Sequence, residues 1–144
     1  MTCQIIDLTV GEWLQLHQAE PVLVSADMPL KQVAEQMLIR GHRDAYVARE
    51  QTILGHLNFN KVINHLFAHE RPIHTHRQLF ARVTEATASE LMDPHYAYCR
   101  ENEVLCDVLH RQLESDIDDL IVLGSDNMLC GVIVLKELVR ESLK

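Results

Sequence analysis

Residues 29–55 read PLKQVAEQMLIRGHRDAYVAREQTILG, and residues 104–131 read VLCDVLHRQLESDIDDLIVLGSDNMLCG. Each stretch begins with apolar residues at the three- and four-residue spacing that lines one face of a helix. In the first stretch these are Leu30, Val33, Ala34, Met37 and Leu38, and in the second, 75 positions later, they are Leu105, Val108, Leu109 and Leu113. The chain therefore contains an internal repeat, which decides the fold.

Polar residues, proline and glycine predict where the two helices begin and end. We expect Asp27 to cap the first helix, Pro29 to occupy its first turn and Gly41 to end it in a left-handed conformation. In the second copy Asn102 is the candidate cap, and residues 115–119 close the segment.

Short runs rich in Val, Ile and Tyr follow each helix and predict a hairpin of two strands. Each hairpin has a polar turn and one glycine, and a second amphipathic helix follows it. The first copy has strand-like residues at 22–25, 45–48 and 53–57 and a final helix at 62–67. The second copy has strand-like residues at 96–100, 120–123 and 128–133 and a final helix at 135–143.

The repeated unit is thus β-α-β-β-α, about 57 residues long, and alone it buries too little surface to be comfortably stable. We expect an α/β (α+β) fold in which two such units pack through their sheets with pseudo-twofold symmetry. The whole chain, 1–144, is then a single module, with a first motif at 9–67, a connecting segment at 68–86 and a second motif at 87–143.

Composition excludes several classes of protein. The formal net charge of −8 at pH 7 opposes nucleic-acid binding, which depends on clustered Lys and Arg. The four cysteines form no C-x-x-C pair, so we expect reduced thiols and no zinc knuckle or redox motif. No apolar stretch is long enough to cross a bilayer and no basic leader is present, which predicts a cytoplasmic protein without a membrane segment.

The repeat, with its motifs in this order, resembles the tandem CBS pair, or Bateman module. The resemblance covers roughly residues 9–143 and is carried by PLxxVAxxM at 29–37, YV at 46–47, ILG at 53–55, SELMDP at 89–94 and CGVI at 130–133. It implies two clefts between the repeats that often bind AMP, ADP, ATP or S-adenosylmethionine. It also implies a disc-like homodimer that regulates a partner protein.

The family pattern points to candidate ligand residues, although this sequence departs from it. In nucleotide-binding members a Ser or Thr and an Asp follow the hairpin glycine by three and six residues and bond the ribose. Here those positions hold Asn58 and Lys61 in the first copy, and Val134 and Glu137 in the second. A lysine cannot accept hydrogen bonds from the ribose, whereas Glu137 can.

A His-Arg pair holds the phosphates in some related members, and His42-Arg43 stands at that place here. The second copy has Ile117 and Asp118 instead, so a phosphorylated ligand is expected in the cleft built by the first copy. Ser25 is a further candidate for a polar contact. The alternative is that His42 and Arg43 form an exposed loop without a ligand, and Ser25 a plain turn.

Neither catalysis nor a metal site is expected. No nucleophile motif or glycine-rich phosphate loop occurs, and no cofactor is implied. His65, His69, His74 and His76 could together bind zinc or nickel, but a solvated helix end and linker is the simpler interpretation. Two functions stay open: a sensor of an adenosine-type ligand that modulates a partner, and a ligand-independent dimerisation or protein-interaction module with degenerate clefts.

Overall fold

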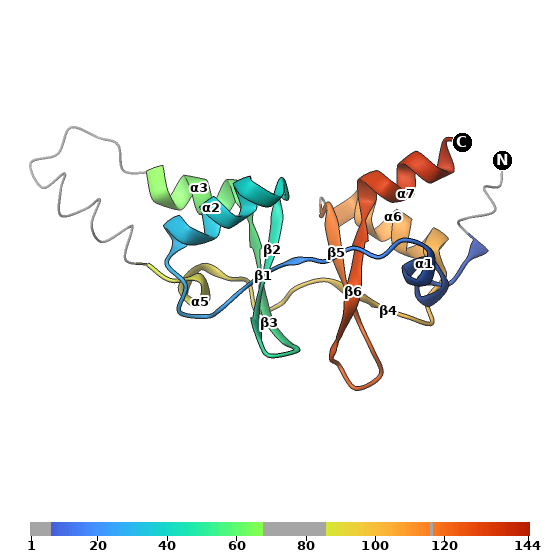
Figure 1. The fold of residues 1–144 in the computed structure, drawn as a ribbon, viewed down its shortest axis with the longest axis horizontal. Helices are drawn as coiled ribbons and strands as arrows, with labels where there is room; N and C mark the ends of the chain where they lie inside the picture. The colour runs from blue at the N-terminus through green and yellow to red at the C-terminus, as the bar shows by residue number, and fades with distance from the viewer. Residues whose placement is uncertain (1–6, 68–85, 116) are drawn as a thin grey trace, which may run out of the picture. The chain divides into compact units, whose positions relative to one another are not determined.

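The computed structural model describes residues 7–67, 86–115 and 117–144, and it divides the chain into two compact units (Figure 1). Unit 2 is the continuous stretch Val22–Tyr96, whereas unit 1 combines Met1–Pro21 with Ala97–Lys144. Each unit carries one three-stranded sheet with its own helices, so the predicted α/β (α+β) class and its two repeats are confirmed. The expected connecting segment, 68–86, lies outside the described residues except for Ala86.

In unit 2 the strands lie in the order β1-β2-β3, with β1 parallel and β3 antiparallel to β2. Its elements are β1 (Val22–Val24), α2 (Leu30–Arg40), β2 (Asp44–Arg49), β3 (Thr52–Asn58), α3 (Phe59–Phe67) and α5 (Ala88–Leu91). Most of the predicted helical face supplies the core, because Leu30, Val33 and Met37 are buried against the sheet. The prediction is wrong for Leu38 and, in the second copy, for Leu113, which are 65% and 59% exposed.

Unit 1 repeats this arrangement with the strand order β4-β5-β6. Its elements are α1 (Val10–Leu16), β4 (Tyr98–Arg100), α6 (Leu105–Ser115), β5 (Asp119–Leu123), β6 (Leu129–Val134) and α7 (Leu135–Ser142). The only tryptophan of the chain, Trp13 on α1, is 1% exposed and belongs to the same core cluster as Leu105, Ile133 and Leu138.

The leading helix of each repeat packs in the unit formed mainly by the other repeat. Helix α1 opens the first repeat in sequence but packs in unit 1, and α5 opens the second repeat but packs in unit 2. Three backbone hydrogen bonds hold each leading helix, and they correspond one to one. For α1 they run from Leu105 N to Leu8 O, from Val10 N to Glu103 O and from Gly11 N to Glu101 O. For α5 they run from Leu30 N to Ala86 O, from Ala88 N to Met28 O and from Ser89 N to Ala26 O. The compact units therefore differ from the consecutive motifs 9–67 and 87–143.

The helix ends agree with the sequence in part. Gly41 ends α2 with a φ of 69°, as predicted. The prediction for Asp27 is wrong, because its carboxylate accepts a hydrogen bond from Ser25 at 2.8 Å while Pro29 occupies the cap position without a side-chain hydrogen bond. Asn102 is also too early, since α6 begins at Leu105.

Within the described residues, none of the helices combines the length and the apolar character that a membrane span requires.

Candidate functional site

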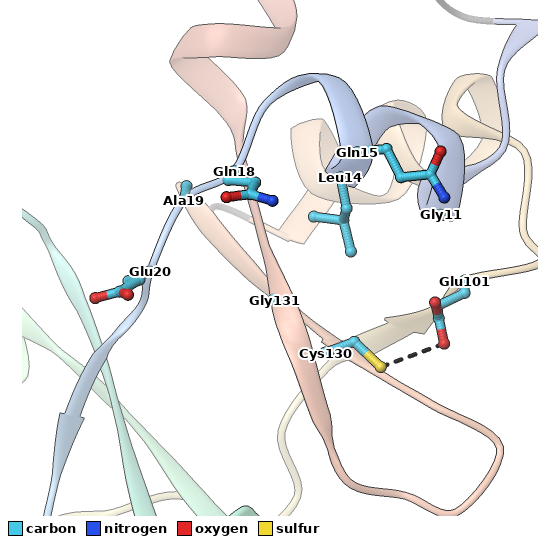
Figure 2. A pocket seen from close by; sticks show the side chains of 9 residues that line it. All are labelled: Gly11, Leu14, Gln15, Gln18, Ala19, Glu20, Glu101, Cys130 and Gly131. Atoms are coloured by element: carbon cyan, nitrogen blue, oxygen red, sulfur yellow. Dashed lines mark hydrogen bonds between the residues drawn. The ribbon is translucent and has the colours of Figure 1, made fainter.

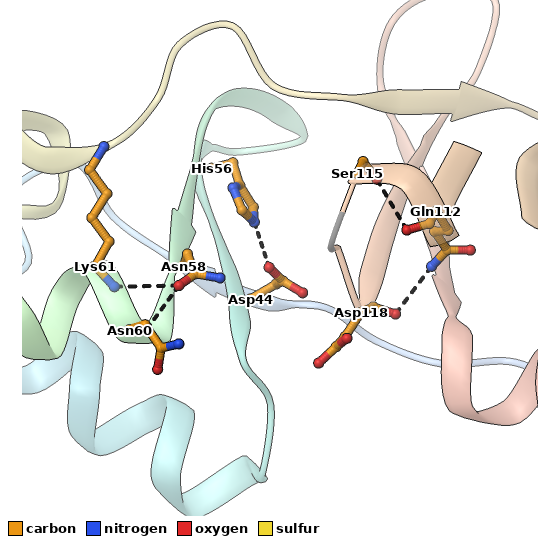
Figure 3. Close-up of polar contacts among 8 residues, drawn as sticks. All are labelled: Asp44, His56, Asn58, Asn60, Lys61, Gln112, Ser115 and Asp118. Atoms are coloured by element: carbon orange, nitrogen blue, oxygen red, sulfur yellow. Dashed lines mark hydrogen bonds and ion pairs between the residues drawn. The ribbon is translucent and has the colours of Figure 1, made fainter. Parts of the chain in front are cut away.

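Four of the candidate residues lie at one end of the unit 2 sheet, where α3 begins, and Figure 3 shows two of them, Asn58 and Lys61. The main chain brings them together: the amide of His42 donates to the Met37 carbonyl at 3.1 Å, and the amide of Phe59 donates to the Arg43 carbonyl at 2.8 Å. The loop between α2 and β2 is thereby tied to the first turn of α3. His42, Arg43, Asn58 and Lys61 consequently share this end of unit 2.

Asn58 has a structural role at this place. Its side-chain oxygen accepts hydrogen bonds from the amides of Asn60 at 2.9 Å and Lys61 at 3.3 Å, so it caps α3. The side chains of Arg43 and Lys61 are exposed and His42 is half-buried. Two cationic groups thus accompany the positive end of a nine-residue helix, an arrangement that favours an anion.

Ser25 does not join this group. Strand β1 runs parallel to β2 with Val22 opposite Ala45 and Val24 opposite Val47, so Ser25 follows the far end of β1. Its hydroxyl donates to the Asp27 carboxylate, and the residue is exposed. The sheet therefore separates Ser25 from the loop that carries Arg43.

The corresponding end of unit 1 has the same backbone and the opposite charge. The amide of Leu135 donates to the Asp118 carbonyl at 2.7 Å, as that of Phe59 does to Arg43. Glu137 lies in the first turn of α7, where its carboxylate accepts a hydrogen bond from Arg140 at 2.7 Å. Asp118 and Glu137 of unit 1 thus stand at the positions of Arg43 and Lys61, although Arg140 pairs with Glu137 and Lys136 lies beside it. The two positions that are cationic in unit 2 are acidic in unit 1, which makes them less suited to an anion.

A buried polar pair in unit 2 was not anticipated from the sequence. Asp44 begins β2 and is 1% exposed, and its carboxylate lies 2.7 Å from the imidazole Nε2 of His56 on β3. The ring of His56 also lies against that of Tyr46, with centroids 5.1 Å apart. The sequence did contain a hint of this pair. An aspartate begins the apolar run of each copy, at Asp44 and Asp119, and only the first copy has a histidine on the neighbouring strand.

The histidine cluster receives no support from the described part of the chain. His65 lies in α3, while His69, His74 and His76 lie outside the described residues. Among the residues that are described, no group of three His, Cys, Asp or Glu side chains is placed to hold a metal ion.

Comparisons with known proteins agree with this architecture. Residues 88–144 match the family model of the CBS domain. A CBS domain-containing protein from Thermotoga maritima is 18% identical, with a TM-score of 0.73 and 92% of each chain covered. The CBS-pair protein CBSX2 from Arabidopsis thaliana is 18% identical, with a TM-score of 0.74 and 94% of each chain covered. CBSX2 in complex with AMP matches at 19% identity and a TM-score of 0.72, over 94% of this chain and 96% of that one. Curated protein sequences give no match.

Proposed function

Residues 88–144 match the CBS domain model and the chain has the fold of a CBS pair. From this premise we propose that the chain is a regulatory, non-catalytic module that senses an adenosine nucleotide and modulates a partner protein. The nucleotide in the CBSX2 complex, AMP, supports this class of ligand. The observation that carries the proposal for this chain is the cationic end of unit 2, formed by His42, Arg43, Asn58 and Lys61.

The chemistry of that end favours phosphate over ribose. A guanidinium binds phosphate oxygens in a bidentate manner, and the lysine adds a second positive charge at a helix N-terminus. No carboxylate occupies the Lys61 position to accept from ribose hydroxyls. Affinity should therefore rise with phosphate charge, in the order AMP, ADP, ATP, and S-adenosylmethionine, which has no phosphate, should bind most weakly.

Isothermal titration calorimetry with these four compounds tests the proposal. We expect one nucleotide per chain, because unit 1 carries Asp118 and Glu137 at the positions of Arg43 and Lys61. The variant Arg43→Gln should weaken ATP binding about tenfold, the effect of losing one charge-assisted contact.

The matched control is Lys136→Gln. Lys136 is an exposed cation in the first turn of α7, so its loss changes the net charge equally but at the other unit. It should leave ATP affinity unchanged. Absence of heat with all four compounds, or equal affinity of the Arg43→Gln variant and the wild type, would contradict nucleotide sensing at this end of unit 2.

A second candidate function is ligand-independent interaction, and one observation favours it. Candidate side chains already have protein partners, among them Ser25 with Asp27, Asn58 as the cap of α3 and Glu137 with Arg140. Under this second function the module acts by homodimerisation. Leu38 and Ile39 on α2 are 65% and 78% exposed, which supports an apolar contact surface. Sedimentation equilibrium with Ile39→Lys tests it: a dimer that dissociates in the variant supports the interaction module, and a monomeric wild type contradicts it.

A further inference from the structure

Unit 1 contains a cavity of about 630 Å³ (Figure 2), and neither Asp118 nor Glu137 is among the residues that line it. Helix α1 and the chain that follows it form one wall, with Leu14, Gln15 and Gln18, and the start of β6 forms the other, with Cys130 and Gly131. Its volume is within the range of small-molecule pockets, roughly 300–1,000 Å³.

The fold itself does not impose this cavity, because unit 2 fills the corresponding place. There the chain leaves α5 after Leu91, and Asp93 exchanges two backbone hydrogen bonds with His56 on β3, at 3.0 and 2.9 Å. Tyr96 then places its hydroxyl on the Ile53 carbonyl at 3.1 Å.

In unit 1, α1 instead continues to Leu16, three residues longer than α5. Within the described residues no bridge joins the chain after α1 to β6. Among the described residues, the cavity thus lies beside β6 at a place where the chain of unit 2 bridges β3 instead.

The lining of this cavity is polar and negative. Glu20 and Glu101 contribute carboxylates, Gln15 and Gln18 contribute amides, and none of the lining residues is basic. The Cys130 thiol donates to the Glu101 carboxylate at 3.3 Å. Partial removal from water, this hydrogen bond and the charges of Glu101 and Asp126 raise the pKa of Cys130 to about 11, so the thiol stays neutral and adds no further charge.

We propose that this cavity binds a small organic cation with a primary amine or guanidinium group. Such a group donates to the carboxylates of Glu20 and Glu101, the two glutamines supply further acceptors, and Leu14 contacts the alkyl part of the ligand. A nucleotide is excluded by its negative charge. The described residues also lack three metal-binding side chains placed around one point, which favours an organic cation over a metal ion.

The site is separate from the cationic end of unit 2, so its test does not depend on nucleotide binding. The experiment is a titration of the ¹⁵N-labelled full chain with agmatine, followed by two-dimensional NMR. We expect saturable shifts at the amides of Gly11 and Gly131 and at the side-chain amide of Gln15. The uncharged analogue 1,4-butanediol and the dianion succinate should leave these signals in place.

Variants locate the charge that selects the ligand. Glu101→Gln should weaken agmatine binding about tenfold, and Gln15→Glu should strengthen it several-fold. Glu35→Gln, an equal charge change on the exposed side of α2 in unit 2, should have no effect. The NMR spectrum of each variant shows directly whether it is folded.

Three results would overturn the proposal. The first is that agmatine at about 10 mM moves none of these signals, a concentration that detects even millimolar binding. The second is that succinate moves them as agmatine does, or that neither Glu101→Gln nor Gln15→Glu changes the affinity. The third is that magnesium chloride produces the same shifts at lower concentration, because the site would then take a metal ion.

Discussion

Units 1 and 2 share one backbone framework and differ in what surrounds it. The same three backbone hydrogen bonds hold the leading helix in each, and each hairpin glycine faces a side chain of that helix segment, Leu14 in unit 1 and Met92 in unit 2. After this contact the two units differ. In unit 2 the segment that follows α5 forms a bridge to β3, whereas in unit 1 a cavity lies between the segment that follows α1 and β6. The two units thus repeat one backbone arrangement with different surroundings.

Corresponding positions show the same divergence in side-chain chemistry. Arg43 and Lys61 of unit 2 match Asp118 and Glu137 of unit 1, so the sign of the charge at the end of the sheet is inverted. In the core, Met37 of α2 matches a buried glutamine on α6. Exchanging residues between matching positions therefore tests how far the two units are equivalent.

The largest effect is expected from Met37→Gln. Met37 is 1% exposed among apolar side chains, so an amide there loses its hydrogen bonds to water. The Arg43 and Leu57 carbonyls correspond to the partners of Gln112, but the amide would have to reach them in a core packed around a thioether. We expect the free energy of unfolding to fall by about 3 kcal/mol, measured by urea denaturation.

The reverse exchange, Gln112→Met, is the matched control. Gln112 donates to the carbonyls of Asp118 (Figure 3) and Ile133, at 3.1 and 3.0 Å, while its own buried oxygen has no partner among the described residues. Loss of two hydrogen bonds and removal of one unsatisfied acceptor should nearly cancel, within about 1 kcal/mol. Equal destabilisation by both exchanges would show that the two cores respond alike.

Hairpin glycines give the next largest effect. A Cβ added at Gly55 would lie 2.6 Å from the Met92 sulfur and 2.9 Å from its Cβ, too close for the methionine to avoid by rotating its end. Gly55→Ala should therefore cost about 2 kcal/mol of unfolding free energy. The same change at Gly131 meets only the end of Leu14, at 3.1 Å, and should cost less than about 1 kcal/mol.

Thermal and urea unfolding of both alanine variants measure this difference. Adding Met92→Ala to the Gly55→Ala variant should recover part of the loss, because the clash is removed. If the double variant lost as much unfolding free energy as the two single variants together, Met92 would not be the obstacle.

The sequence predicted the elements of each repeat and missed the exchange of their leading helices. Helical spacing and the Gly41 end depend on neighbouring residues, and both were correct except that Leu38 and Leu113, at the ends of the predicted faces, are exposed. The pairing of α1 with unit 1 depends on contacts between residues about 90 positions apart, such as Gly11 with Glu101, which local pattern does not contain. The cap at Asp27 failed for a local reason, since Ser25 already occupies its carboxylate.

For the candidate site, the sequence could identify residues whose place in the loops puts them at the same end of the sheet. It could not identify residues that meet only through side-chain packing between strands. His42, Arg43, Asn58 and Lys61 do share one end of unit 2. The pair of Asp44 and His56 was missed because an alternating polar residue on a strand is ordinarily solvated.

The Asp44–His56 pair distinguishes unit 2 from unit 1, where Val132 stands opposite β5 in place of the histidine. His56→Val should lower the free energy of unfolding by about 1–2 kcal/mol, because a buried carboxylate loses a hydrogen-bond donor. His95→Val, at an exposed position in the same unit, serves as control and should change it by less than about 0.5 kcal/mol. An unchanged urea midpoint in His56→Val would show that the pair contributes no stability.

The smallest effect concerns the reactivity of Cys130, whose counterpart in unit 2 is Leu54. With its pKa raised to about 11, the thiol supplies little nucleophilic thiolate at pH 8, roughly one part in a thousand. Glu101→Gln removes both a negative charge and a strong acceptor, which lowers the pKa of Cys130 and should raise its alkylation rate by iodoacetamide several-fold. Cys99 is the internal control, since burial raises its pKa to about 12 and excludes the reagent in both proteins. Peptide mapping by mass spectrometry measures each site separately. If Cys130 reacted at the same rate in both proteins, Glu101 would exert no electrostatic influence on this wall, and the negative character assigned to the unit 1 cavity would lose its main support.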